Sequence, residues 1–117
     1  MSSALEITSR REGDEAAVLS LAGEVDVANT PQVRDAALQL VSAGVMRLVI
    51  DLSATEYMDS AGLGTLIGLH KRLKELGGAL LLAGPKPRVK RLLDITGLDQ
   101  ILAVHEDVAA ALKEDAG

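Results

Sequence analysis

The sequence predicts a single α/β domain with a mixed sheet of about five strands and about four helices packed against it. Two observations carry this prediction. Two apolar segments near the N-terminus flank a short polar loop, and strand-like and helix-like segments alternate from about residue 46 onward. The 117-residue length suits one domain. We place this domain at residues 4–113 and expect residues 1–3 and 114–117 to be flexible termini.

The first two strands are expected to form an antiparallel hairpin. Leu5 and Ile7 alternate with polar neighbours, which is typical of a half-buried strand. Residues 11–14 read Arg-Glu-Gly-Asp and indicate a turn, and a second strand with apolar Val18 and Leu21 follows. A short polar loop that contains glycine favours a hairpin at this point.

The first helix and the third strand follow the hairpin. Thr30 is a plausible N-cap and Pro31 suits the first helical position, while Gly44 ends the helix. Apolar residues recur between them at helical spacing, namely Val33, Ala36, Ala37, Leu40 and Val41. The nearly continuous apolar run of residues 46–52 predicts a strand that is covered on both faces.

The remaining elements alternate in the same way. A second helix begins near Asp59 or Ser60 and ends at Gly77. The elements expected after it are a strand at 79–83, a helix after Pro87 that stops before Gly97, a strand at 101–104 and a helix capped by Asp107. Short connections of this kind imply right-handed crossovers, so these strands should be largely parallel.

Composition excludes several classes of function. The formal net charge is −5 and Tyr57 is the only aromatic residue, whereas nucleic-acid binders usually combine a basic face with stacking platforms. The chain has no cysteine and two histidines, which makes disulfides, thiolate chemistry and transition-metal sites unfavourable. No signal-peptide pattern or apolar run of roughly 18 residues is present, so we expect a cytoplasmic protein without membrane contact or cofactor.

Two loops concentrate small and acidic residues at the carboxyl ends of strands, where sites in α/β sheets commonly lie. They are residues 23–26 (Gly-Glu-Val-Asp) and residues 57–64 (Tyr-Met-Asp-Ser-Ala-Gly-Leu-Gly). Asp59 or Ser60 could cap the second helix. Ser60 could also be a phosphorylation site, because helix N-termini accept anions. These two interpretations are compatible.

Three further residues in these loops allow two interpretations each. Gly62 and Gly64 are unusual in the first turn of a helix, since each lowers helix propensity by about 1 kcal/mol relative to alanine. They indicate either tight packing or a bare backbone that a partner can approach. Asp26 is either a turn residue that hydrogen-bonds its own backbone or an acid that pairs with a basic partner residue.

Catalysis is disfavoured. His70 lies about three turns beyond Ser60 on the same predicted helix, and nothing ties His105 to that serine. Met58 stands where a nucleophile elbow requires glycine. No Gly-Lys-Ser/Thr follows the glycines, so the segment is not a Walker loop.

The chain resembles STAS domains, and specifically bacterial anti-sigma factor antagonists. Residues 21–26, 48–52 and 57–64 carry this resemblance in the expected order, and it spans roughly residues 4–113. It implies a protein that is not an enzyme and that binds an anti-sigma factor with serine kinase activity, which frees a sigma factor. Phosphorylation of Ser60 would end binding and a serine phosphatase would restore it. The implied partner-binding residues are Asp26, Asp59, Ser60, Ala61, Gly62, Leu63 and Gly64.

The resemblance also allows a second function. Some STAS domains are constitutive scaffold subunits of lipid-transport or stress-signalling complexes, and such a subunit would not switch. In either case the resemblance implies a monomer or a weak dimer. The acidic composition separately predicts no direct contact with nucleic acid.

Overall fold

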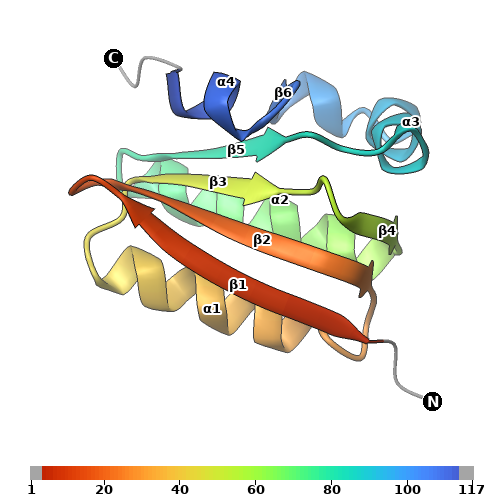
Figure 1. The fold of residues 1–117 in the computed structure, drawn as a ribbon, viewed down its shortest axis with the longest axis horizontal. Coiled ribbons are helices and arrows are strands. Elements are labelled where there is room, and N and C mark those ends of the chain that lie inside the picture. The colour runs from red at the N-terminus through yellow and green to blue at the C-terminus, as the bar shows by residue number, and fades with distance from the viewer. Residues whose placement is uncertain (1–3, 114–117) are drawn as a thin grey trace.

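The computed structural model describes residues 4–113. Within these residues, six strands form one sheet in the order β1-β2-β3-β5-β6, and β4 pairs with the end of β2 (Figure 1). The strands are β1 (Leu5–Glu12), β2 (Ala16–Val25), β3 (Arg47–Asp51), β4 (Thr55–Met58), β5 (Ala79–Ala83) and β6 (Ala103–His105). The helices are α1 (Thr30–Ser42), α2 (Ser60–Glu75), α3 (Pro87–Ile95), α4 (Val108–Lys113) and the short 3₁₀ helix η1 (Leu98–Gln100).

The pairing of the strands confirms the predicted fold class. β1 and β2 are antiparallel, with Leu5 opposite Gly23 and Glu12 opposite Ala16. All other paired strands are parallel. The expected cap of the closing helix is also present, since the Ala110 amide donates to Asp107 Oδ1 at 2.8 Å. The expectation of flexible termini concerns residues 1–3 and 114–117, which lie outside the described residues.

The long strand β2 changes its parallel partner along its length. Its first half pairs with β3, from Ala16 opposite Arg47 to Ser20 opposite Asp51. A register shift between Gly23 and Glu24 then pairs its end with β4. The loop predicted from the sequence begins at Tyr57, whereas Tyr57 and Met58 form the end of β4, so this prediction was wrong for these two residues. Because of this change of partner, the carboxyl ends of β2 and β4 lie next to each other.

Helix α1 also begins differently from the sequence prediction. Thr30 is the first helical residue and Asn29 precedes it as the N-cap, so the predicted cap at Thr30 was wrong by one position. The Asn29 side chain makes no capping bond and instead binds within the loop before the helix. Pro31 lies in the first turn, where its missing amide hydrogen costs nothing.

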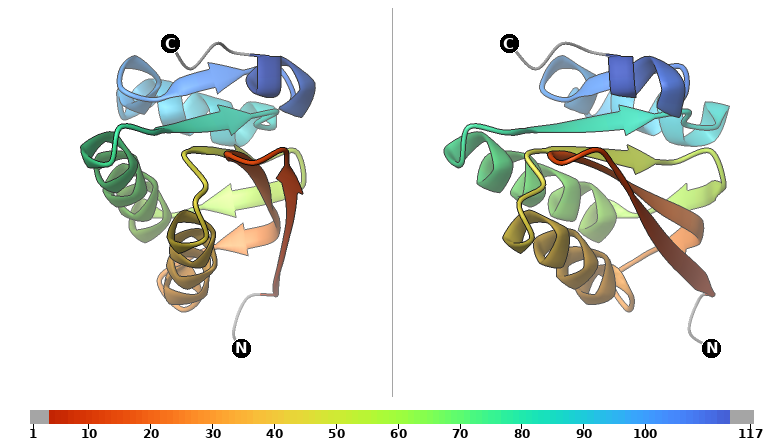
Figure 2. Two further views of the ribbon diagram at one scale, coloured as in Figure 1. Left: turned by 90° about the vertical axis from the view of Figure 1, so that its left-hand side faces the viewer. Right: turned by 60° about the vertical axis from the view of Figure 1, so that its left-hand side comes forward.

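Two apolar cores cover the two faces of the sheet. Helices α1 and α2 lie side by side on one face, and α3 adds to the same core (Figure 2). Alternate residues of β2 and β3, such as Leu19 and Leu48, point into it. Helix α4 covers part of the other face over Val18, Val49 and Leu81. Within residues 4–113, no helix combines the length and apolar character that crossing a membrane requires.

Candidate functional site at the start of helix α2

Asp59 connects the two loops that the sequence analysis singled out. Val25 of β2 lies opposite Met58 of β4, so Asp26 and Asp59 follow neighbouring strands. The Asp59 amide donates to the Val25 carbonyl oxygen at 3.1 Å, and the Val27 amide donates to Asp59 Oδ2 at 3.1 Å. The loop after β2 and the start of α2 are therefore held together by one residue.

Asp59 also caps helix α2. Its extended backbone, with φ −95° and ψ −175°, lets Asp59 Oδ1 accept a hydrogen bond from the Gly62 amide at 3.0 Å. The sequence left the cap open between Asp59 and Ser60, and the structure assigns it to Asp59. Ser60 is the first helical residue and is exposed. Its hydroxyl forms no hydrogen bond within residues 4–113.

The double role of Asp59 predicts a stability effect. Asp59→Ala should lower the free energy of unfolding by about 1–2 kcal/mol, because it removes the cap and the Val27 contact. Asp59→Asn should keep most of the stability, since asparagine caps nearly as well as aspartate. Urea unfolding followed by circular dichroism measures both. Asp35→Ala, at an exposed acid of α1, is the matched control, and an equal loss in that variant would contradict the assigned role.

The loop after β2 is ordered by its own side chains. Asp26 Oδ1 accepts from the Ala28 amide at 2.9 Å, which confirms the turn interpretation of this residue. Asn29 is only 7% exposed. Its Oδ1 accepts from the Asp26 amide at 2.9 Å and its Nδ2 donates to the Glu24 carbonyl at 2.8 Å. Asn29 is not among the site residues predicted from the sequence, where its only signal is its place just before a Thr-Pro helix start.

The two signature glycines differ in their surroundings. A Cβ on Gly62 would lie 2.5 Å from Met58 Cγ and 3.0 Å from Val25 Cγ1, so this glycine allows tight packing. A Cβ on Gly64 would meet nothing within 4 Å, and Gly64 is exposed. Packing therefore explains Gly62 and leaves Gly64 unexplained. Leu63 between them is buried in the core, and Ala61 is half-buried.

Two exposed apolar side chains flank this surface, and neither is among the site residues predicted from the sequence. Val27 is 73% exposed, and its amide is the one that contacts Asp59. Tyr57 is 43% exposed on β4, two positions before Asp59. Large exposed apolar side chains near one another are typical of protein-docking surfaces. Val27 lies in the turn after β2 and Tyr57 lies on β4, so their exposure follows from the folded structure and not from a sequence pattern.

The histidines are not placed to activate Ser60. His70 lies ten residues further along α2, about 15 Å at 1.5 Å per residue. Burial lowers the pKa of His70, and Lys74 and Lys71 lower that pKa further. His105 is on the edge strand β6, which β3 and β5 separate from β2. Among residues 4–113, no group of three histidine or acidic side chains is arranged to hold a metal ion.

The mixed sheet of residues 4–113, with its antiparallel N-terminal hairpin and four α-helices, is the fold of STAS domains. The STAS domain pattern matches residues 8–111, and the chain belongs to the STAS domain family. Within that family it belongs with the anti-sigma factor antagonists, which are non-enzymatic regulators. It is 41% identical over 86 residues to the anti-sigma-B factor antagonist of Bacillus subtilis strain 168, which covers 74% of this chain and 78% of the relative.

Solved structures agree with this assignment. The crystal structure of an anti-sigma factor antagonist from Mycobacterium paratuberculosis matches with a TM-score of 0.84 at 28% identity, over 93% of this chain and 92% of the other. The Bacillus cell fate determinant SpoIIAA in its phosphorylated form matches with a TM-score of 0.69 at 22% identity, over 85% and 90%. The second likeness concerns the fold alone.

Proposed function

We propose that this protein is a cytoplasmic anti-sigma factor antagonist controlled by phosphorylation of Ser60. In its unphosphorylated form it binds an anti-sigma factor that is also a serine kinase, and the sigma factor is released. The kinase transfers the γ-phosphoryl group of ATP to the Ser60 hydroxyl oxygen. That oxygen loses its proton and bonds to the γ-phosphorus, while the bond from this phosphorus to the β–γ bridging oxygen breaks and ADP is released. The phosphorylated protein dissociates, and a serine phosphatase hydrolyses the ester.

The observation that carries the proposal is the exposed, unengaged hydroxyl of Ser60. Because Asp59 caps the helix, Ser60 is not needed for that task. A kinase can reach its hydroxyl without unfolding the helix. A phosphate there would also sit at the positive end of the helix dipole. The fold is therefore expected to tolerate the modification, and the phosphorylated form of SpoIIAA supports this at the level of the fold.

Electrostatics explains how phosphorylation would end binding. The phosphate adds about −1.5 to −2 charge at neutral pH, next to Asp59 and close to the loop of Asp26. A partner that approaches this surface closely would meet repulsion and would have to desolvate the new charge. We propose that Asp26, Asp59, Ser60, Ala61 and Gly64 face the partner. Gly62 and Leu63, which the resemblance also assigned to binding, are buried and would position the others from inside.

Incubation with ATP and each anti-sigma factor kinase of the source genome tests the proposal. We expect one kinase to add a single phosphate, which peptide mass mapping assigns to Ser60. Ser60→Ala should bind that kinase and take up no phosphate. Stable binding to a lipid-transport or stress-signalling assembly, with no phosphate uptake from any kinase, would instead establish the scaffold function.

A further inference from the structure

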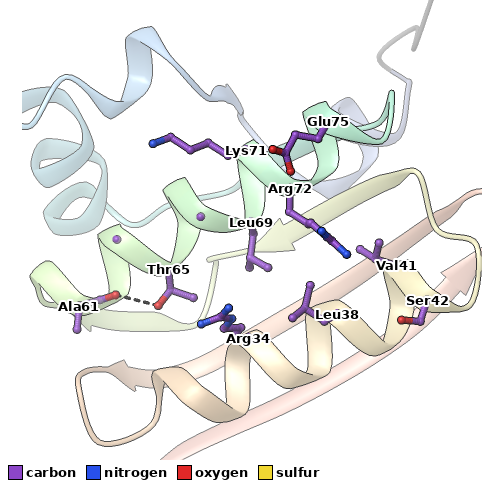
Figure 3. A pocket seen from close by; sticks show the side chains of 12 residues that line it. Arg34, Leu38, Val41, Ser42, Ala61, Thr65, Leu69, Lys71, Arg72 and Glu75 are labelled. Atoms are coloured by element: carbon purple, nitrogen blue, oxygen red, sulfur yellow. Dashed lines mark hydrogen bonds between the residues drawn. The ribbon is translucent and has the colours of Figure 1, made fainter.

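A groove of about 760 Å³ lies between helices α1 and α2 (Figure 3). Its floor is apolar: Leu38 and Val41 come from α1 and Leu69 comes from α2. Leu69 is buried, whereas the two α1 residues are half-buried at the groove surface. We call this feature the α1–α2 groove. It begins at Ala61, directly beside Ser60, and extends to Glu75.

The α1–α2 groove is basic on a strongly acidic protein. Arg34, Lys71 and Arg72 line it, and Glu75 is the single acidic lining residue among residues 4–113. The whole chain carries a formal charge of −5. In the part of the chain that the structure describes, none of these three cations forms an ion pair. Figure 3 shows Arg72 reaching from α2 toward α1. The groove therefore has cationic edges available to a carboxylate-bearing partner.

Two glycines leave part of the α2 side of the groove without side chains. Gly64 and Gly68 both line it, both are exposed, and a Cβ on either would meet nothing within 4 Å. Neither glycine is therefore required by packing. The groove runs along fifteen residues of α2, from Ala61 to Glu75. The fourteen steps between them rise about 21 Å at 1.5 Å per residue, which matches about four turns of a partner helix.

We propose that the α1–α2 groove binds an amphipathic helix of the anti-sigma factor. The apolar side chains of that partner helix pack on Leu38, Val41 and Leu69, and its acidic side chains pair with Arg34 and Arg72. This inference rests on the proposed function and deepens it. Helix-in-groove recognition combines an apolar face with flanking charges in this way. An acidic helix that ends beside Ala61 would be repelled directly by a phosphate on Ser60, which connects the docking groove to the switch.

Charge reversal tests this proposal with the purified kinase that phosphorylates Ser60. The double variant Arg34→Glu/Arg72→Glu should raise the Kd, measured by titration calorimetry in 0.15 M NaCl, by at least about tenfold. The control Lys90→Glu/Arg91→Glu changes the net charge by the same amount at exposed positions of α3. It should change the Kd by less than about threefold, since charges remote from a contact are largely screened.

An uncharged variant separates contact from general electrostatics. Gly68→Leu would fill the groove without altering charge. It should weaken binding at least about tenfold while unfolding in urea at no lower concentration than the wild type. A third variant, Ser60→Asp, places a negative charge at the proposed phosphorylation site and should weaken binding. If Ser60→Asp binds weakly while Gly68→Leu and the arginine double variant keep the wild-type affinity, the groove proposal is wrong and the phosphoswitch stands. Failure of the wild type to bind any kinase overturns the proposed function itself.

Analytical sedimentation of the free protein measures its oligomeric state, and so tests whether a second copy of this chain occupies the α1–α2 groove. If the wild type forms a dimer that Gly68→Leu abolishes, and kinase binding is unaffected, the occupant is a second copy of this chain and the proposal is wrong. A monomer at all concentrations, together with weakened kinase binding, supports the anti-sigma factor helix.

Discussion

Ser60→Asp is expected to weaken binding to the anti-sigma factor by about 10- to 100-fold and to leave the stability of the fold nearly unchanged. Full phosphorylation should weaken it several-hundred-fold, which corresponds to about 3–4 kcal/mol. Aspartate carries one charge where phosphate carries nearly two, so its effect should be smaller. At the first helical position, a negative charge interacts favourably with the helix dipole, so the fold itself should not suffer.

Titration calorimetry with the cognate kinase measures the affinity, and urea unfolding measures the stability. Ser9→Asp, on the exposed surface of the edge strand β1, makes the same substitution away from the site. It should change the affinity by less than about twofold because the added charge is screened over that distance. Ser60→Ala should bind like the wild type. Equal affinities for the wild type, Ser60→Asp and the phosphorylated protein would contradict the switch.

The fold was predictable because its main elements carry strong local patterns. The apolar runs of β3 and β5 and the helical spacing in α1 and α2 each indicate one structure. Strand β4 carries no such pattern: Thr55 and Met58 are buried, while Glu56 and Tyr57 between them are exposed. Its pairing depends on the register shift in β2 beside Gly23, which is a tertiary feature.

The site was predictable in its location and not in its details. Chain order alone brought the loop of Asp26 and the start of α2 to the same edge of the sheet. Aspartate and serine are about equally good caps, so no sequence rule could assign that role to Asp59. The assignment came from the carboxylate position, which also reaches the Val27 amide. The α1–α2 groove required the packing of two helices that are separate in the sequence.

The difference between Gly62 and Gly64 leads to a prediction with opposite signs for the same substitution. Gly62→Ala should lower the free energy of unfolding by about 1–3 kcal/mol, because the added methyl group overlaps Met58 and Val25 in a well-packed core. Gly64→Ala should raise it by up to about 1 kcal/mol, because the site is open and alanine favours the helix. Urea unfolding of both variants against the wild type measures this contrast.

In Gly64→Ala, the affinity for the kinase is expected to fall although the stability of the fold rises. If a partner backbone approaches α2 over Gly64, the methyl group of Gly64→Ala should weaken kinase binding by about tenfold in a protein that is more stable than the wild type. Thr8→Ala on the exposed face of β1 is a control for a small surface change, and its affinity should stay at the wild-type value. Unaltered binding by Gly64→Ala would show that no partner comes close there. If Gly64→Ala is more stable than the wild type and still binds more weakly, unfolding cannot explain the lost affinity. The added methyl group must then interfere with the partner at the surface of α2.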